Sequence, residues 1–394
     1  MHGLDRLNKF QIILLGVLSA FAVFSMDFYL PGLPALQKDL HTTASLAQMT
    51  ITTSLVGLGV GQLFIGPWSD RIGRRVPLLV GTLVFGITSL LMIDINNIWF
   101  MIVLRFFQGL SGSVGIVLSL AIITDCFDGK ELTKNIAINQ AINGVFPVLA
   151  PIIGGLVVMA ADWQMTFVIM AVMGFCLWIG VKWGLPETRK PKENISQVGG
   201  NTVNYKELIH DKNFTLYLLI QALMMASLFA YIAGSSFVLE NIFQLSIPMF
   251  GVVYAINGIG ITIATSFAGF FARKYGEHLI LGGFIIYGIF GGLLLAGSLF
   301  FANDLWLILI AFFIITSAIG GVQGMATALA MRGKQDQAGS ASALLGMARY
   351  AIGGLMSPLV GVFGTDSYVA LAILICLVQW GAFILYLRVP RLKM

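Results

Sequence analysis

The sequence predicts an all-α membrane protein in which twelve transmembrane helices form two halves of six helices each. Of its 394 residues, 58% are hydrophobic and only 10% are charged, and its mean hydropathy is +0.90. In soluble proteins about a quarter of the residues are charged, so this chain has too few polar side chains to cover a surface in water. Apolar runs of about 20 residues, the length that crosses a bilayer, recur along the whole chain.

Twelve such runs predict twelve transmembrane helices. Arg6 and Lys9 precede the first run as in a signal peptide, but the further runs favour an uncleaved first helix. The expected spans are residues 11–31, 46–66, 76–94, 98–122, 136–160, 164–184, 214–237, 247–271, 279–302, 305–330, 340–363 and 367–387.

The longest polar segment, residues 185–213, predicts a cytoplasmic linker. It contains Pro and Gly together with several Lys and Arg residues, a composition typical of linkers. It divides the chain into an N-terminal half, residues 1–184, and a C-terminal half, residues 214–394, with six runs in each. Many transporters are built from two such halves and bind their substrate near the middle of the bilayer.

The basic residues predict the orientation in the membrane. If the N-terminus is cytoplasmic, all but three of the 23 Lys and Arg residues fall on the cytoplasmic side; the exceptions are Lys38, Arg105 and Arg349. Cytoplasmic loops are enriched in Lys and Arg, so we expect both termini in the cytoplasm and the protein in the cytoplasmic (inner) membrane. The net charge of +5 is spread singly among loops, which argues against nucleic-acid binding.

Composition and motifs also exclude several function classes. The three cysteines and four histidines do not cluster with one another or with carboxylates, so we expect no metal site and no cofactor. The sequence has neither a Walker loop nor a nucleophile elbow, which argues against an ATP-driven pump and against an enzyme. We expect a monomer whose partners are the lipid bilayer, protons and a small-molecule substrate.

Apart from Asp94 and Lys182 at the ends of their spans, two charged residues lie within the spans of the N-terminal half. Asp27, the only acid so placed, either caps the end of the first helix at the interface or carries a proton, because a carboxylate that leaves water is costly unless it is neutralised. Arg105 lies a few residues into the fourth span, where its guanidinium keeps its charge and is expensive to expose to lipid. It either snorkels to the surface or faces a cavity or a partner, and Asp27 has a similar expected depth.

The loop between the second and third spans has an unusual composition. Residues 66–75 read Gly-Pro-Trp-Ser-Asp-Arg-Ile-Gly-Arg-Arg, with four charged residues and three helix breakers in ten positions. Gly and Pro favour tight turns, so we expect a cytoplasmic hairpin. The positions that define the pattern are Gly66, Asp70, Arg71, Gly73, Arg74 and Arg75.

Polar side chains lie along the fifth span at helical spacing. Asn135, Asn139 and Asn143 recur every four residues, and Phe146 continues the same face. A polar stripe on an apolar helix indicates either a water-filled cavity or helix packing, and both interpretations stay open.

The second part of the fifth span contains residues that bend helices or bring them together. Pro147 and Pro151 each remove a backbone donor, so we expect a bent helix. Gly154 and Gly155 allow a neighbouring helix to approach closely.

These motifs resemble those of the major facilitator superfamily. The segment 66–75 is similar to the family's loop between spans two and three, with Trp68 in place of a leucine, and Arg105 with Gln108 is similar to its span-four motif. The resemblance implies a gating role for the loop, in which Arg71 and Arg74 hold Asp125 at the inner end of span four. It also implies a role for Arg105 in proton coupling.

Other motifs narrow the resemblance to twelve-span drug/proton antiporters of the bicyclomycin-resistance group. Residues 150–155, a small residue followed by Pro, two further residues and Gly-Gly, resemble an antiporter motif. Residues 27–34 and 339–346 resemble the span-one and span-eleven motifs of that group. The group carries an uncharged residue near position 349, where this chain has Arg349.

We therefore predict proton-coupled efflux of drugs or small metabolites by alternating access, as in multidrug efflux and antibiotic resistance. Asp27 would bind the proton and Arg105 would tune it. A proton-coupled symporter that takes up a nutrient or metabolite on the same fold is the alternative. The expected substrate cavity is lined by Tyr29, Gln108, Asn139, Asn143, Phe146, Tyr231, Tyr254, Asn257 and Arg349.

Arg349 has three open interpretations. It lies about ten residues into the eleventh span, where an unpaired charge is expensive. It either pairs with a carboxylate across a hydrated cavity, receives an anionic substrate, or is a structural Arg bonded to helix carbonyls.

Overall fold

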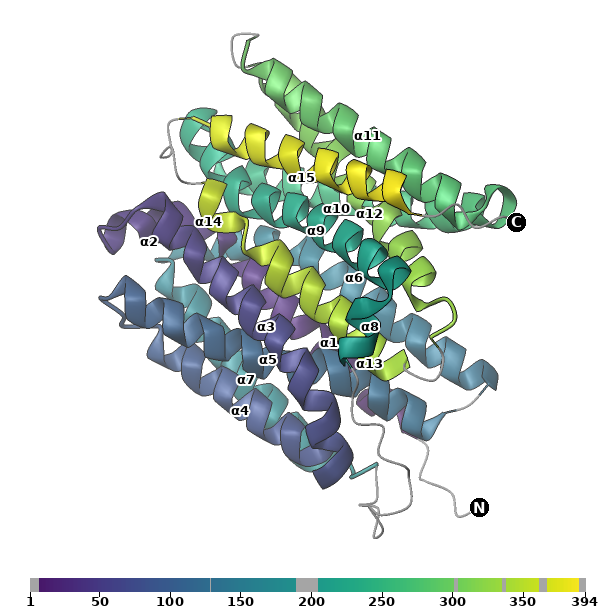
Figure 1. The fold of residues 1–394 in the computed structure, drawn as a ribbon. Helices are drawn as coiled ribbons and strands as arrows, with labels where there is room; N and C mark the ends of the chain where they lie inside the picture. Colours follow the sequence, from purple (N-terminus) through teal and green to yellow (C-terminus); the bar gives the residue numbers. More distant parts are fainter. Residues whose placement is uncertain are drawn as a thin grey trace. The chain divides into compact units, whose positions relative to one another are not determined.

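The fold is known from a computed structural model, which describes residues 7–127, 129–188, 205–300, 304–334, 338–360 and 367–389. Within these ranges the regular elements are helices and no strand occurs (Figure 1). In the described part of the chain, ten helical segments are long and apolar enough to cross a membrane. Two shorter apolar segments, the helix Arg75–Leu91 and the part Leu149–Ala160 of a longer helix, fall where the third and fifth spans are expected. The all-α membrane fold is confirmed, and these segments follow the twelve expected runs in order.

The chain divides into two compact units. Unit 1 comprises residues 1–36 and 53–201, and unit 2 comprises residues 37–52 and 202–394. The long helix Ala44–Ile72 contributes its first part to unit 2 and the rest to unit 1.

In unit 1, α1 packs mainly against two later helices, and α4 packs between two neighbouring helices. The main partners of α1 are α5 and α6, and those of α4 are α5 and α7. The elements are α1 (Lys9–Phe28), η1 (Leu30–Gly32), α2 (Leu33–Asp39), α3 (Ala44–Ile72), α4 (Arg75–Leu91), α5 (Ile98–Cys126), α6 (Gly129–Ala160) and α7 (Gln164–Gly184).

In unit 2, α9 is the central element, in contact with α12, α15 and η4. Two short segments, η2 and η4, are π-helical. The elements are α8 (Tyr205–His210), α9 (Lys212–Ser236), η2 (Phe237–Ile242), α10 (Ile247–Tyr275), α11 (Glu277–Ser298), α12 (Leu305–Met331), α13 (Ala338–Met347), η4 (Ala348–Ile352), α14 (Ser357–Val360) and α15 (Val369–Arg388). The first part of α3 is tied to this unit, where Thr52 Oγ1 donates to the carbonyl oxygen of Gly354 at 2.8 Å.

The outer faces of the helices are apolar. Trp183, Phe270 and Trp306 are each 70–73% exposed. Large exposed apolar areas mark interaction surfaces or contact with a membrane. Together with the lengths of the spans, they indicate that lipid covers these faces.

The structure differs from the predicted hairpin at residues 66–75. Helix α3 continues through Gly66 and Pro67 and ends at Ile72. A proline within a helix removes one hydrogen bond, and here the remaining bonds of a 29-residue helix hold it together. The turn lies at Gly73, whose φ of +95° is the conformation that ends many helices.

Candidate functional site

Arg105 lies in the interior of unit 1. Its side chain on α5 is completely buried, and its guanidinium carbon lies 4.4 Å from the centre of the Tyr29 ring. Its Nη1 donates a hydrogen bond to Gln108 Oε1, and Gln108 Nε2 donates to Ser89 Oγ on α4 at 2.7 Å. Arg105 therefore faces protein partners rather than the membrane surface. Because a guanidinium stays charged, the cluster holds a fixed positive charge, which the cation–π contact stabilises.

Asp27 lies in the last turn of α1, two residues before Tyr29. It is 4% exposed, so it is not an acid in contact with solvent. The C-terminal end of a helix carries partial negative charge, so a carboxylate there does not stabilise the helix by capping. Its position argues against the capping interpretation, and its role as a proton carrier stays a prediction.

The polar stripe of α6 faces α1. Asn143 Nδ2 donates to Ser19 Oγ at 2.5 Å, and Ser19 Oγ lies 2.7 Å from Asn139 Oδ1. The ring centres of Phe146 and Phe24 are 5.7 Å apart. Of the two interpretations of this stripe, these contacts favour helix packing.

The close approach of α6 to α1 continues at Gly154. A Cβ atom at this position would lie 1.8 Å from the carbonyl oxygen of Phe28, so a residue larger than glycine has no room. Pro151 and Gly155 on the same helix are buried, whereas the side chain of Pro147 lies outside the described residues. The predicted close contact is therefore present at Gly154.

Three residues expected to line the cavity meet in unit 2. Asn257 Nδ2 on α10 donates to the hydroxyl of Tyr231 on α9 at 2.7 Å. The ring centres of Tyr231 and Tyr254 are 6.0 Å apart in a stacked arrangement, and Phe312 packs edge-on against Tyr231 at 5.0 Å. All of these side chains are buried. In the described part of unit 2, Arg349 contacts Gln221 rather than this aromatic cluster.

Arg74 is the centre of the loop between α3 and α4. Its Nη1 donates to Ser69 Oγ at 2.6 Å and to Asp70 Oδ1 at 2.8 Å. Its Nε donates to Asp125 Oδ2, near the end of α5, at 3.0 Å. The expected contact with Asp125 is thus made by Arg74, whereas Arg71 is exposed.

Glu187, which follows α7, binds this loop and was not predicted from the sequence. Its carboxylate accepts hydrogen bonds from the backbone amides of Arg74 at 2.8 Å and Arg75 at 3.0 Å. Negative charge is favoured at the N-terminus of a helix, which is where α4 begins. A Cβ atom at Gly73 would lie 2.5 Å from Glu187 Oε2, so the glycine leaves room for the carboxylate. The available signal was an acid directly after Pro186, just beyond the end of the sixth run.

Ser19 and Gln221 were also missed. Ser19 lies in a long apolar run, and small hydroxyl residues are common in membrane helices because they bond to backbone carbonyls. Gln221 lies in the middle of the seventh run and is 1% exposed. A long neutral amide in such a run was a usable signal, since a buried carboxamide needs hydrogen-bond partners.

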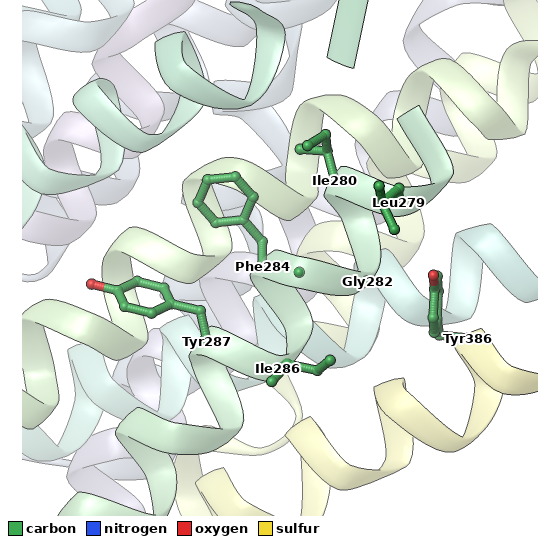
Figure 2. A pocket seen from close by; sticks show the side chains of 8 residues that line it. Leu279, Ile280, Gly282, Phe284, Ile286, Tyr287 and Tyr386 are labelled. Atoms are coloured by element: carbon green, nitrogen blue, oxygen red, sulfur yellow. The ribbon is translucent and has the colours of Figure 1, made fainter. Parts of the chain in front are cut away.

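An apolar pocket of ≈ 560 Å³ lies on α11 of unit 2 (Figure 2). Side chains of α11 and Tyr386 of α15 line it, and Leu279 and Ile286 are more than half exposed. None of the residues expected to line the substrate cavity belongs to it. Such an open apolar surface is typical of a face in contact with hydrocarbon, and we assign no substrate to it.

Comparison with known proteins places the chain in a family. The model of the Major Facilitator Superfamily matches residues 14–358. The chain is 35% identical over 357 residues to the uncharacterized MFS-type transporter YdgK of Bacillus subtilis, covering 90% of this chain and 89% of the relative. It is 30% identical over 372 residues to a bicyclomycin resistance protein homolog of Haemophilus influenzae, covering 90% of each.

A solved structure supports the fold. The crystal structure of the nucleoside transporter NupG matches with a TM-score of 0.74 at 13% identity, covering 97% of this chain and 100% of that one. At this identity the similarity concerns the fold alone. The family model matches most of the chain, and both relatives cover about 90% of it. The chain therefore belongs to the Major Facilitator Superfamily, a family of membrane transporters and not of enzymes.

Proposed function

We propose that this protein exports drugs or small metabolites across the cytoplasmic membrane in exchange for protons. The observation that carries the proposal is the similarity to a bicyclomycin resistance protein homolog along 90% of both chains. Residues 150–155, whose Gly154 seats α6 against α1, support antiport because they resemble an antiporter motif. Uptake by symport is the second candidate, and no feature of the described residues favours it.

In this proposal Asp27 carries the proton. Its burial at 4% exposure makes the charged carboxylate costly, so a proton that neutralises it has a large effect on the free energy of the site. Arg105 supplies a fixed positive charge in the same unit, held by Tyr29 and Gln108. A positive charge near a carboxylate favours its ionised form, so Arg105 would tune the release of the proton.

Exchange follows if the proton and the compound are bound in alternation. We propose that the two six-helix halves, residues 1–184 and 214–394, move relative to one another about the linker 185–213, so that the compound is exposed first to one side and then to the other. The loop centred on Arg74, with its bonds to Asp70 and Asp125, would act as a gate on the cytoplasmic side, with both termini on that side.

The test is transport by the purified protein in liposomes with an imposed pH gradient. Bicyclomycin, the compound in the relative's name, and a panel of other neutral antibiotics serve as probes. Antiport predicts accumulation when the lumen is acidic, because protons then leave as the compound enters. Symport predicts accumulation when the outside is acidic, and the absence of any dependence on the gradient would refute proton coupling.

Asp27→Asn tests the proton carrier. The variant should lose accumulation driven by the pH gradient. It should still let the compound move down its own concentration gradient, because Asn is similar in size to Asp but cannot take up or release a proton. Asp94→Asn is the matched control, since Asp94 is exposed in the turn before α5. Unchanged gradient-driven transport in Asp27→Asn would overturn the assignment.

A further inference from the structure

The side chains around Arg349 form a polar cluster inside unit 2. The structure places Gln221 of α9 between Arg349 of η4 and Thr327 of α12. The oxygen and nitrogen of a carboxamide are assigned from the hydrogen-bond network. The network orients the Gln221 oxygen to accept from Arg349 Nη2 at 2.8 Å and from Arg349 Nε at 3.2 Å. Thr327 Oγ1 lies 3.2 Å from the same oxygen.

The cluster has more hydrogen-bonding capacity than it uses. Arg349 has five N–H donors, and the single Gln221 oxygen accepts from only two of its nitrogens. Gln323 of α12 lies 3.0 Å from the same Gln221 oxygen, so with that oxygen as the acceptor it is the Gln323 nitrogen that faces Gln221. The donors left for a ligand are therefore the remaining N–H groups of Arg349.

The charge of Arg349 is not balanced within the described part of unit 2. The described ion pairs of this unit join Asp211 to Lys334 and Glu277 to Arg332, and neither includes Arg349. Asp304 caps the start of α12. Gln221 is neutral, so it orients the guanidinium without neutralising it.

The position of Arg349 makes that imbalance costly. It lies near the middle of the candidate span Ser340–Val360, where a charged side chain is expensive unless it faces a cavity or a partner. The backbone around it, Ala348–Ile352, is π-helical. Single π-helical turns within α-helices occur frequently at functional sites, because they turn side chains away from the regular helical positions.

We propose, on the basis of the transport function above, that Arg349 binds the carboxylate of the transported compound. Gln221 holds one side of the guanidinium, which leaves its other N–H groups to donate to an acceptor. The planar guanidinium matches the two oxygens of a carboxylate, which it binds through two parallel hydrogen bonds. Gln323 and Thr327 add neutral polar groups beside the same Gln221 oxygen. The substrate class is therefore small organic acids, together with drugs that carry a carboxylate.

The experiment measures binding to the purified full-length protein in nanodiscs. The probes are three matched pairs of acid and amide: benzoate and benzamide, salicylate and salicylamide, nicotinate and nicotinamide. Because each pair differs only in the acidic group, the ratio of the two affinities reports recognition of the carboxylate. We expect the unchanged protein to bind at least one acid about tenfold more tightly than its amide, the size expected of a charge-assisted hydrogen bond.

Arg349→Gln should remove the preference for the acid and leave binding of the amide unchanged. Arg349→Lys keeps the charge but not the planar donor pair, so it should retain only part of the preference, and it serves as the second variant if Arg349→Gln does not fold. Arg332→Gln is the matched control, because Arg332 lies in the same unit, is exposed and pairs with Glu277. It should leave the preference intact.

Four results would overturn the proposal: no binding of any acid, amides bound as tightly as acids, equal losses of acid and amide in Arg349→Gln, or a full preference in Arg349→Lys. Transport of bicyclomycin driven by a pH gradient separates this proposal from the transport function. Gradient-driven transport without a preference for acids would refute the role of Arg349 alone. A preference for acids without gradient-driven transport of either bicyclomycin or the preferred acid, above the flux in protein-free liposomes, would refute proton exchange and leave the carboxylate site standing.

Discussion

Arg74 Nε lies 3.0 Å from Asp125 Oδ2, which ties the turn after α3 to the last turns of α5. The same guanidinium bonds Ser69 and Asp70 through Nη1. The Arg74 side chain is only 8% exposed, whereas that of Asp70 is 48% exposed. Screening by water is weaker for the buried member, so the contact fixes the geometry of the turn between α3 and α4 more than an exposed ion pair would.

Replacing Arg74 by Ala should destabilise unit 1. The change removes charge-assisted hydrogen bonds to Asp70 and Asp125, and we expect the free energy of unfolding to fall by about 1–3 kcal/mol. Thermal unfolding of the purified protein in detergent checks this. Arg71→Ala is the control, because Arg71 is exposed and surface changes are usually within about 0.5 kcal/mol. Equal effects of the two substitutions would contradict the central position of Arg74.

Gly154→Ala should disturb the contact between α6 and the end of α1. The added Cβ atom would lie 1.8 Å from the carbonyl oxygen of Phe28, so one helix must move, at a cost of about 1–3 kcal/mol. Phe28 adjoins Asp27, and we therefore expect slower proton-driven exchange as well as a lower melting temperature.

Gly269→Ala provides the comparison for Gly154. A Cβ atom at Gly269 meets no atom within 4 Å, and alanine favours helix over glycine by about 1 kcal/mol. That variant should keep its activity and be as stable as the unchanged protein or slightly more stable. A Gly154→Ala protein with the same melting temperature and exchange rate would show that the two helices separate easily.

The sequence was sufficient for the fold because apolar runs of bilayer length can be counted without knowing any contact. The predicted end of α3 is wrong, since Gly66 and Pro67 favour a turn although the helix runs on to Ile72. A single proline removes one donor, and a long helix tolerates that loss. Only Gly73 has the positive φ that ends the helix.

The candidate site was predictable in part. Asp27, Arg105 and Arg349 were recognisable because a charge in an apolar run is conspicuous on its own. Their partners depend on which helix lies opposite, and spacing within one helix does not contain that information. Gln221 illustrates this limit, because its importance arises from Arg349, 128 residues further along the chain.

Asp211 connects the stability of unit 2 to pH. Its carboxylate caps α9 by accepting from the backbone amides of Asn213 and Phe214. The hydrogen bond from Lys334, with the capping bonds, lowers the pKa of Asp211 below its ordinary value of 3.8. Because the folded pKa is the lower one, the stabilisation is complete well above pH 3.8 and is lost as the pH falls through the folded pKa.

Two substitutions separate the cap from the charge of Asp211. Asp211→Asn keeps a capping oxygen but not the charge, and should cost up to about 1 kcal/mol at neutral pH. Asp211→Ala loses both and should cost about 1 kcal/mol more. The melting temperatures of the unchanged protein and of Asp211→Asn should converge as the pH is lowered below 3.8. A difference that grows on acidification would refute the assigned sign.

The last prediction concerns the contact between Arg105 and Tyr29. The guanidinium carbon lies 4.4 Å from the ring centre, and Arg105 is fully buried, so the cation–π contact should be worth about 2 kcal/mol, at the upper end for such pairs. Tyr29→Phe keeps the aromatic face and should retain most of this contact, whereas Tyr29→Leu removes it.

A double-mutant cycle of Tyr29→Leu with Arg105→Gln measures the coupling. Thermal unfolding should give a coupling free energy of about 1–2 kcal/mol, because each single change leaves the other partner without the contact. The same four proteins, tested for exchange driven by a pH gradient, show whether the pair also affects proton coupling. If Tyr29→Leu slows this exchange while Tyr29→Phe does not, the ring holds Arg105 in the position from which it acts on Asp27. A coupling near zero would mean that Gln108, which accepts from Arg105 Nη1, positions the guanidinium without help from the ring.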